Sequence, residues 1–225
     1  MSIVKSICLF ISVFVIAGGC AFFAISPVSN DIDTPVLPYK IVLDAGHGGI
    51  DVGAVGVSGT SESDLNLEYT LELKSQLEKY GFTVVLTRND KNGLYSEYKN
   101  GFKKEDMQKR KQIIEAENPD LFISIHQNKF ASSSSYGPQV FYTPNSEKSK
   151  NFVLSVKSSF DTNLDTKKRE IKEGDFYMLY CSPCPSILIE CGFLSNPEEE
   201  KLLIDKQYKK QFCYLIVCGI FQYLA

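Results

Sequence analysis

The stretch Leu121-Phe-Ile-Ser-Ile-His-Gln-Asn128 is a short apolar run that ends in a histidine. Such a run predicts a strand that is buried on both faces. The chain has one other histidine, His47, and it follows a similar run, Ile41-Val-Leu-Asp-Ala45. Two unrelated core histidines would not share this placement. We therefore predict that both imidazoles are metal ligands at the carboxyl edge of one sheet.

Strand and helix patterns alternate along the rest of the chain. Apolar strands that are each followed by a helix predict an α/β fold, a single domain with a mostly parallel central sheet and helices on both faces. In such sheets ligands bind beyond the carboxyl ends of the strands. The expected strands are 40–45, 82–88, 121–126, 139–142, 176–180 and 186–190, and the expected helices are 64–80, 104–117, 145–162, one beginning at Asn196-Pro197, and 206–223.

The composition excludes two classes of protein. Of the 225 residues 44% are hydrophobic and 23% are charged, which is ordinary for a globular protein and argues against disorder. The formal net charge of -3 comes with no basic stripe, so we expect no nucleic-acid partner.

The first 26 residues form a hydrophobic segment that precedes the domain. Residues 6–25 carry no charge and Lys5 is the only charge before Asp31, and about 20 such residues are enough to cross a bilayer. We interpret residues 1–26 as a signal-anchor or signal peptide, 27–38 as a Pro-rich linker and 39–225 as the catalytic domain. We expect a retained membrane anchor with the domain outside the membrane. The alternatives are a cleaved signal peptide, giving a secreted protein, and a lipoprotein cleaved before Cys20.

Five cysteines follow this segment, and an odd number leaves at least one unpaired within the chain. Two of them form a single CxxC motif, and a structural zinc site would need a second pair of ligands. We interpret all five as small buried or loop thiols. They are Cys181, Cys184, Cys191, Cys213 and Cys218.

Two histidines and one carboxylate, with an open fourth position, are the usual ligands of a catalytic zinc ion. The carboxylate must reach the same sheet edge, and the acids near the first strand are Asp51, Glu62 and Asp64. We favour Glu62 because it lies just before the first predicted helix, where the loop from His47 returns.

Glu190 ends the aliphatic strand Ser186-Ile-Leu-Ile-Glu190. Partial burial raises the pKa of a carboxyl group toward the range that suits a general base. The alternative is a structural acid paired with an arginine. Beside a metal ion, the general-base role predicts hydrolysis of an amide or an ester.

Five motifs resemble those of one family in order and spacing. The first, Leu43-Asp-Ala-Gly-His-Gly-Gly-Ile-Asp51, resembles the opening motif of the zinc-dependent N-acetylmuramoyl-L-alanine amidases of the amidase_3 family. A GHGG sequence alone is weak, but five ordered motifs over residues 40–225 are highly specific. The family usually has Pro at the position of Ala45 and often Lys at that of Ser63. The other motifs are Glu62–Leu67, Leu86–Arg88, Ser124–Asn128 and Leu188–Asn196.

The resemblance implies a metal site and a reaction. His47, Glu62 and His126 would hold one Zn²⁺ ion, and Glu190 would be the catalytic acid and base. The substrate would be peptidoglycan, cut at the amide between the lactyl group of N-acetylmuramic acid and the L-alanine of the stem peptide. The alternatives are a zinc peptidase that acts within the stem peptide and a catalytically silent peptidoglycan-binding module.

Three further residues lie in or near the motifs. Arg88 closes the third motif. Arg110 matches a recurrent family arginine, for which the alternative is a solvated helix charge, and we give it no catalytic role. Asn128 would orient the loop after His126 or contact the substrate.

The subtype follows from what surrounds the domain. Some relatives carry an inserted helix that plugs the zinc site, and residues 129–175 are short for it, so we expect no such plug. A single domain behind an anchor or signal, with Lys104-Glu-Asp-Met-Gln-Lys-Arg110 before the second histidine, resembles the sporulation amidase of the spore cortex. The expected partners are peptidoglycan and, through the N-terminal segment, the membrane. Whether a protein activates the enzyme is left open.

Overall fold

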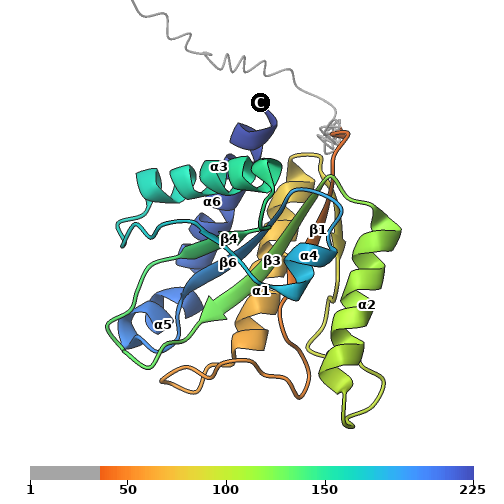
Figure 1. The fold of residues 1–225 in the computed structure, drawn as a ribbon. Helices are drawn as coiled ribbons and strands as arrows, with labels where there is room; N and C mark the ends of the chain where they lie inside the picture. The colour runs from red at the N-terminus through yellow and green to blue at the C-terminus, as the bar shows by residue number, and fades with distance from the viewer. Residues whose placement is uncertain (1–35) are drawn as a thin grey trace, which may run out of the picture. The chain divides into compact units, whose positions relative to one another are not determined.

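The structure, a computed structural model, describes residues 36–225, which form one sheet flanked by helices (Figure 1). The strands lie in the order β2-β1-β3-β6-β4-β5. They span β1 Lys40–Ala45, β2 Thr83–Leu86, β3 Leu121–Asn128, β4 Gln139–Tyr142, β5 Lys172–Glu173 and β6 Ser186–Phe193. The helices span α1 Glu62–Lys79, α2 Phe102–Glu117, α3 Glu147–Asn163, α4 Tyr177–Cys181, α5 Pro197–Ile204 and α6 Lys206–Leu224.

The sheet is mostly parallel, as predicted. β1 pairs in parallel with β2 and β3, and β3 pairs in parallel with β6. β4 is antiparallel to β6, and β5 runs parallel to β4. The register of β3 sets Ile125 beside Ala45 and His126 beside Glu190. The carboxyl ends of β1, β3 and β6 therefore meet at one edge of the sheet.

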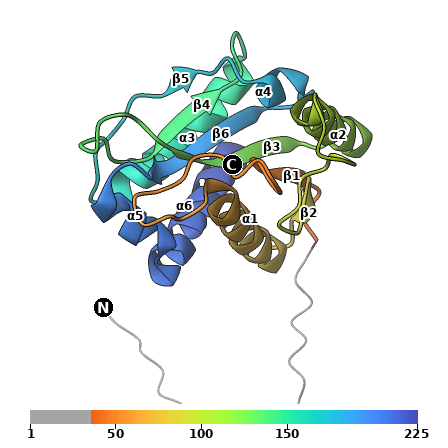
Figure 2. The same ribbon diagram turned by 90° about the horizontal axis from the view of Figure 1, so that it is seen from below.

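Helices cover both faces of the sheet, which confirms the predicted architecture (Figure 2). Strand residues alternate between the two faces. Ile41 and Leu43 pack with residues of α1, α3 and α6, whereas Val42 packs with residues of α2 and α4. The central strands are buried on both sides, which explains why their sequences are apolar runs and not alternating patterns.

The predicted strand 176–180 is wrong, because this segment contains the short helix α4. Two neighbouring residues, Met178 and Leu179, are both buried against the sheet and α2, while Tyr177 and Tyr180 on either side are exposed. This spacing of exposed residues fits one helical turn, and five residues are too few for periodicity to separate helix from strand. The strand that does occur nearby, β5, is two exposed residues long.

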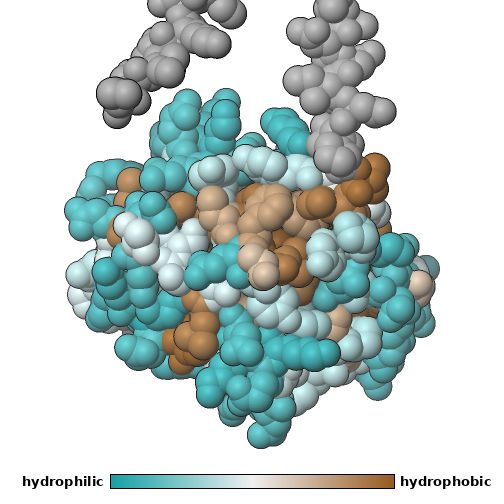
Figure 3. Space-filling view, turned by 90° about the horizontal axis from the view of Figure 1, so that it is seen from above, coloured by the Kyte–Doolittle hydropathy of each residue, from teal (hydrophilic) through white to brown (hydrophobic). Residues whose placement is uncertain are grey.

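The predicted membrane segment, residues 1–26, lies outside the described residues. Within residues 36–225 no helix is long and apolar enough to cross a membrane. Figure 3 views the amino-terminal edge of the parallel strands, where hydrophobic residues lie beside the start of the described chain. Val36, the first described residue, is 81% exposed. Leu37 joins the domain through its N–H, which donates to the Gly81 carbonyl at 2.8 Å.

The cysteines fit their interpretation as buried or loop thiols in part, because Cys181 and Cys218 are half-buried helix residues. None of the five that follow residue 36 forms a disulfide in the described chain. Cys191 and Cys213 are buried, and Cys181, Cys184 and Cys218 are half-buried.

The closest approach of α3 and α6 yields a stability prediction. A Cβ atom at Gly219 would lie 2.6 Å from the Val156 Cα atom, so the two helices meet where one side chain is missing. We expect Gly219→Val to lower the free energy of unfolding by about 1–3 kcal/mol, because the backbone of α3 must move. Gln222→Val, at an exposed position of the same helix, is the control and should cost about 0.5 kcal/mol. Urea unfolding measures both; a Gly219→Val variant that costs no more than the control would show that α3 leaves room for a side chain at position 219.

Candidate active site

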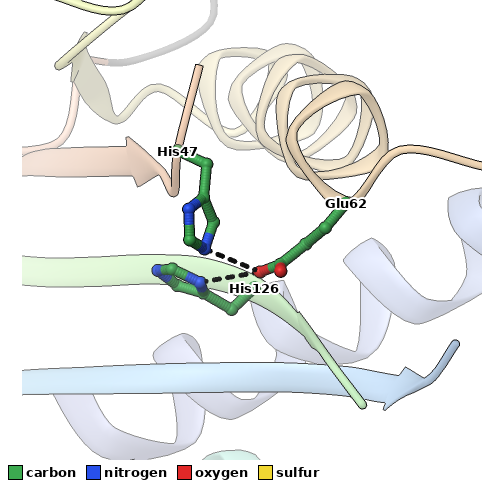
Figure 4. A group of neighbouring side chains, drawn as sticks. All are labelled: His47, Glu62 and His126. Atoms are coloured by element: carbon green, nitrogen blue, oxygen red, sulfur yellow. Dashed lines mark hydrogen bonds and ion pairs between the residues drawn. The ribbon is translucent and has the colours of Figure 1, made fainter. Parts of the chain in front are cut away.

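His47, Glu62 and His126 converge at the carboxyl edge of the sheet (Figure 4). One ligand atom from each of these residues lies within 4.8 Å of the others. The Glu62 Oε1 atom lies 3.3 Å from His47 Nε2 and 3.0 Å from His126 Nδ1. The two imidazole rings stand edge to face with centroids 5.1 Å apart. The structure thus joins residues that are 79 positions apart in the sequence, from 47 to 126.

Glu62 occupies this position because the loop after β1 returns to the first turn of α1. The Ala54 N–H donates to Glu62 Oε2 at 2.7 Å, and the Glu62 N–H donates to the Ala54 carbonyl at 2.9 Å. One turn later, the Asn66 amide donates to Glu62 Oε1 at 3.3 Å. The carboxylate is only 5% exposed, so its direction is fixed by these bonds and its histidine neighbours.

The other two acids considered as third ligand have different partners. Asp51 contacts His47 on the far side of the ring, with Oδ2 3.0 Å from Nδ1. Its second oxygen pairs with the Lys103 ammonium group at 2.9 Å. Asp64 instead pairs with Lys91 on the surface. The structure therefore groups Glu62, and neither Asp51 nor Asp64, with the two histidines.

Asp51 orients the imidazole of His47. A carboxylate on one ring nitrogen of a ligating histidine fixes the tautomer and leaves the other nitrogen for a metal. Burial by itself lowers the pKa of His47, but the hydrogen bonds and charges of Asp51 and Glu62 outweigh it and raise the pKa to about 9. Hydrogen bonding to the histidines likewise holds the pKa values of both carboxyls below their usual range, against the effect of burial.

The three side chains fit a tetrahedral metal ion. Two ligand atoms about 2.0–2.1 Å from such a zinc ion lie roughly 3.3 Å apart. The separations of 3.3 and 3.0 Å between Glu62 and the two imidazole nitrogens are close to this value. Two imidazoles with one carboxylate, supported by Asp51, are also the donor set of catalytic zinc sites.

The loop that carries His47 has an unfavourable backbone that needs support. His47 has a φ of +62°, in the left-handed region that is uncommon for residues other than glycine. Two arginines bind its carbonyl groups. Arg110 donates to the Ala45 and His47 carbonyls at 2.6 and 2.5 Å, and Arg88 donates to the Ala45 and Gly46 carbonyls at 2.9 and 3.0 Å.

Gly46 has no room for a side chain. A Cβ atom there would lie 2.2 Å from the His126 ring, so glycine is required for the two histidines to approach. The opening motif therefore places its glycine where the backbone must pass close to the second ligand.

Arg110 is a buried residue, which excludes the alternative of a solvated helix charge. It is 1% exposed and pairs with Asp44 at 2.7 Å and with Asp106 at 2.5 Å. Burial by itself raises the pKa of Asp44, but the charge of Arg110 and the hydrogen bonds that Asp44 accepts outweigh it and hold the pKa at about 2. The role of Asp44 was missed from the sequence, although an acid inside a buried strand signals a buried partner.

Glu190 lies in register with His126 on the neighbouring strand β6. Its Oε2 atom is buried and has no hydrogen-bond partner among residues 36–225. Burial is the main reason that the pKa of Glu190 is raised to about 7, and the charge of Glu62 adds to it. No arginine pairs with this carboxyl in the described chain, so the alternative of a structural ion pair loses its support.

Asn128 follows His126 at the end of β3. Its side-chain oxygen accepts from the Lys129 N–H at 2.8 Å, and its carbonyl accepts from the Leu194 N–H at 2.8 Å. These bonds fix the chain as it leaves the strand. A contact with substrate stays a prediction.

The buried ion pair yields a second prediction. We expect Arg110→Met to lower the free energy of unfolding by about 3–5 kcal/mol, because Asp44 is left as an unpaired buried charge. The cost should shrink as the pH falls toward about 3, since the unpaired carboxyl, with its pKa now raised, takes up a proton in the folded state. Urea unfolding at several pH values measures this. Lys111→Met, at a partly exposed neighbour, is the control, and a cost independent of pH would point to lost packing instead.

Comparison with known proteins gives a family. Residues 41–222 match the Amidase_3 family model, described as N-acetylmuramoyl-L-alanine amidase. The germination-specific N-acetylmuramoyl-L-alanine amidase of Bacillus subtilis is 34% identical over 195 residues, which cover 85% of this chain and 82% of that protein.

Two solved structures share the fold and much of the sequence. The CwlD amidase from Clostridioides difficile, solved in complex with the GerS lipoprotein, is 41% identical with a TM-score of 0.77 and covers 83% of this chain and 98% of that one. The catalytic domain of CwlV, an N-acetylmuramoyl-L-alanine amidase from Bacillus (Paenibacillus) polymyxa var. colistinus, is 32% identical with a TM-score of 0.73 and the same coverage of both chains. The family match, the relatives and the geometry of the site agree, and this chain belongs to the Amidase_3 family of N-acetylmuramoyl-L-alanine amidases.

Proposed function

We propose that the chain is a zinc hydrolase that cuts peptidoglycan at the amide between the lactyl group of N-acetylmuramic acid and L-alanine. The observation that carries the proposal is the juxtaposition of two sets of groups at one sheet edge. His47, Glu62 and His126 form a cluster that fits a metal ion, and the half-buried Glu190 lies beside it, with a buried Oε2 atom that has no hydrogen-bond partner in the described chain.

The residues that would hold the metal ion and the residues that support them have different roles. When bound by His47, Glu62 and His126, zinc supplies a Lewis acid that polarises the scissile carbonyl and lowers the pKa of water. Asp51 holds the His47 ring so that its Nε2 atom faces Glu62, and Lys103 holds Asp51. Arg110 and Arg88 fix the backbone on which His47 stands.

Glu190 moves the proton. It accepts a proton from the attacking water as the new carbon–oxygen bond forms. It returns that proton to the nitrogen as the carbon–nitrogen bond breaks, so the products are a lactyl carboxylic acid and a free L-alanine amine. Burial of Glu190 raises its pKa above that of an exposed carboxyl, which favours the uptake of the proton from water.

The biological setting is proposed on the same basis. We assign residues 39–225 as the catalytic amidase domain acting outside the cytoplasm, tethered through residues 1–26. A role in the spore cortex is supported by the similarity to the germination-specific amidase of Bacillus subtilis and to CwlD. The GerS lipoprotein bound to CwlD supports the idea that a partner protein also assists this chain.

Digestion of purified peptidoglycan tests the reaction. The full chain with zinc should release stem peptides that begin with an unblocked L-alanine, detected by mass spectrometry, and a chelator should stop the release. Glu190→Gln should reduce the rate by about 10²–10⁴-fold, because the proton transfer is lost. Glu198→Gln, whose side chain is 79% exposed, is the control and should keep the rate.

The products also separate the alternatives. Peptides cut after a later residue would indicate a zinc peptidase, and undigested peptidoglycan with intact binding would indicate a silent binding module. A Glu190→Gln variant as active as the wild type would contradict the assignment of the acid and base.

Zinc content tests the ligand set. Glu62→Gln and His126→Ala should each lose most of the bound zinc, measured by elemental analysis after dialysis, because two ligands hold the ion far more weakly than three. Asp64→Asn is the matched control, since this acid lies two residues from Glu62 and pairs with Lys91 instead. Full zinc in Glu62→Gln, or its loss in Asp64→Asn, would refute the assignment.

A further inference from the structure

A cavity of about 280 Å³ opens beside His47 and His126, between α2 and α4. Its walls are formed by aromatic and methionine side chains from both helices and from the loop before α2. These are Tyr95, Phe102, Met107, Phe176, Tyr177 and Met178. The cavity is close to the low end of the range for small-molecule sites, which is about 300–1,000 Å³, and it is large enough for one sugar ring.

The aromatic side chains of the cavity wall are held by contacts with their neighbours. The Tyr95 hydroxyl accepts the Ile50 N–H at 2.7 Å, and the Tyr95 ring meets the Phe102 ring edge to face at 5.0 Å. Phe176 packs edge to face on Phe141 of β4, also at 5.0 Å. The aromatic surfaces are therefore held in place before any ligand arrives.

The charged groups at the cavity are already paired. Arg110 pairs with Asp44 and Asp106 in the floor. Lys103 at the mouth pairs with Asp51. A charged ligand group would find no free counter-ion here and would lose its hydration, which is costly. The cavity thus favours a neutral ligand that has an apolar face.

The opposite side of the site carries cations. Lys167 and Lys168 are exposed, and Arg169 follows them in the segment before β5. The Arg169 guanidinium lies 4.3 Å from the Phe193 ring centroid and donates to the Tyr136 carbonyl. Phe193 pairs with Asn128, two residues beyond His126, so these cations flank the carboxyl edge of β3 and β6.

We propose that the cavity between α2 and α4 binds the N-acetylmuramic acid ring, and that the stem peptide extends toward Arg169. This inference rests on the proposed function. The two sides of the scissile amide differ in charge and polarity. The sugar is neutral and presents C–H groups to an aromatic wall, whereas the stem peptide bears carboxylates. Aromatic side chains on one side of the site and cations on the other match this difference, and they set the direction in which the substrate lies. Tyr177, which lines the cavity and is 46% exposed, is a specificity-determining residue in this arrangement.

Fluorescence tests the cavity without requiring catalysis. The chain contains no tryptophan, so Tyr177→Trp introduces a single emitter into the cavity wall. Tyr180→Trp, on the same helix but outside the lining, is the control. Both are made in the full chain with Glu190→Gln. N-Acetylmuramoyl-L-alanyl-D-isoglutamine should change the emission of Tyr177→Trp saturably and leave that of Tyr180→Trp unchanged, and L-alanyl-D-isoglutamine should change neither. A response of Tyr177→Trp to the peptide alone, or none to the sugar-bearing ligand, would overturn the proposal.

Kinetics give an independent reading. Tyr177→Ala should lower kcat/KM for N-acetylmuramoyl-L-alanyl-D-isoglutamine about tenfold, the size of one lost aromatic contact. It should leave kcat/KM for D-lactyl-L-alanyl-D-isoglutamine, which has the same amide and no sugar, unchanged. Tyr180→Ala should affect neither substrate. An equal fall on both substrates would place Tyr177 in the structure of the site and not in sugar binding. A wild-type chain that hydrolyses neither substrate would refute the proposed function, and the fluorescence result would still decide what the cavity binds.

Discussion

The buried pair of Asp44 and Arg110 is the interaction on which the site depends. Arg110 reaches from α2 across the end of β1 and binds the Asp44 carboxylate and the carbonyls of Ala45 and His47 together. The left-handed conformation of His47 costs of order 1–3 kcal/mol and persists only where its surroundings enforce it. The guanidinium of Arg110 is anchored on Asp44, so a change in this backbone would leave its hydrogen bonds to the Ala45 and His47 carbonyls unmade. The conformation of His47 is therefore held by the buried guanidinium group of Arg110.

The parallel sheet brings together site residues that are far apart in the sequence. β1, β3 and β6 are neighbours, so the residues at their carboxyl ends share one edge whatever their separation in sequence. The register between β3 and β6 sets Glu190 beside His126. Because successive side chains alternate between faces, a shift of one residue would turn Glu190 away from the cluster. The aliphatic residues before each functional side chain fix that register. The packing of the core therefore determines where the site residues lie.

The sequence is sufficient for the parts of this structure that repeat a pattern. The long helices and central strands begin and end within a few residues of their predicted bounds, because burial imposes periodicity on them. The predicted ligands converge because sheet topology leaves few other arrangements. α4 was not predicted because five residues are too few to show a helical periodicity. β5 was not predicted because its two exposed residues give no apolar pattern. The ion pair of Arg110 was not predicted because a helix sequence does not reveal that a cation has a carboxylate partner 66 positions earlier.

The loop after β1 joins the cluster of His47, Glu62 and His126 to the cavity wall. Its Ile50 N–H donates to the Tyr95 hydroxyl, and its Asp51 carboxylate pairs with Lys103 of α2 at the cavity mouth. The Gly49 N–H donates to the Lys91 carbonyl of the same loop that carries Tyr95, at 2.7 Å. Since Asp51 also orients the His47 ring, a group that presses on the cavity wall acts on the same few residues that aim the first ligand. The wall of the cavity proposed to bind the sugar and the histidine proposed as a metal ligand are thus joined in one hydrogen-bonded unit.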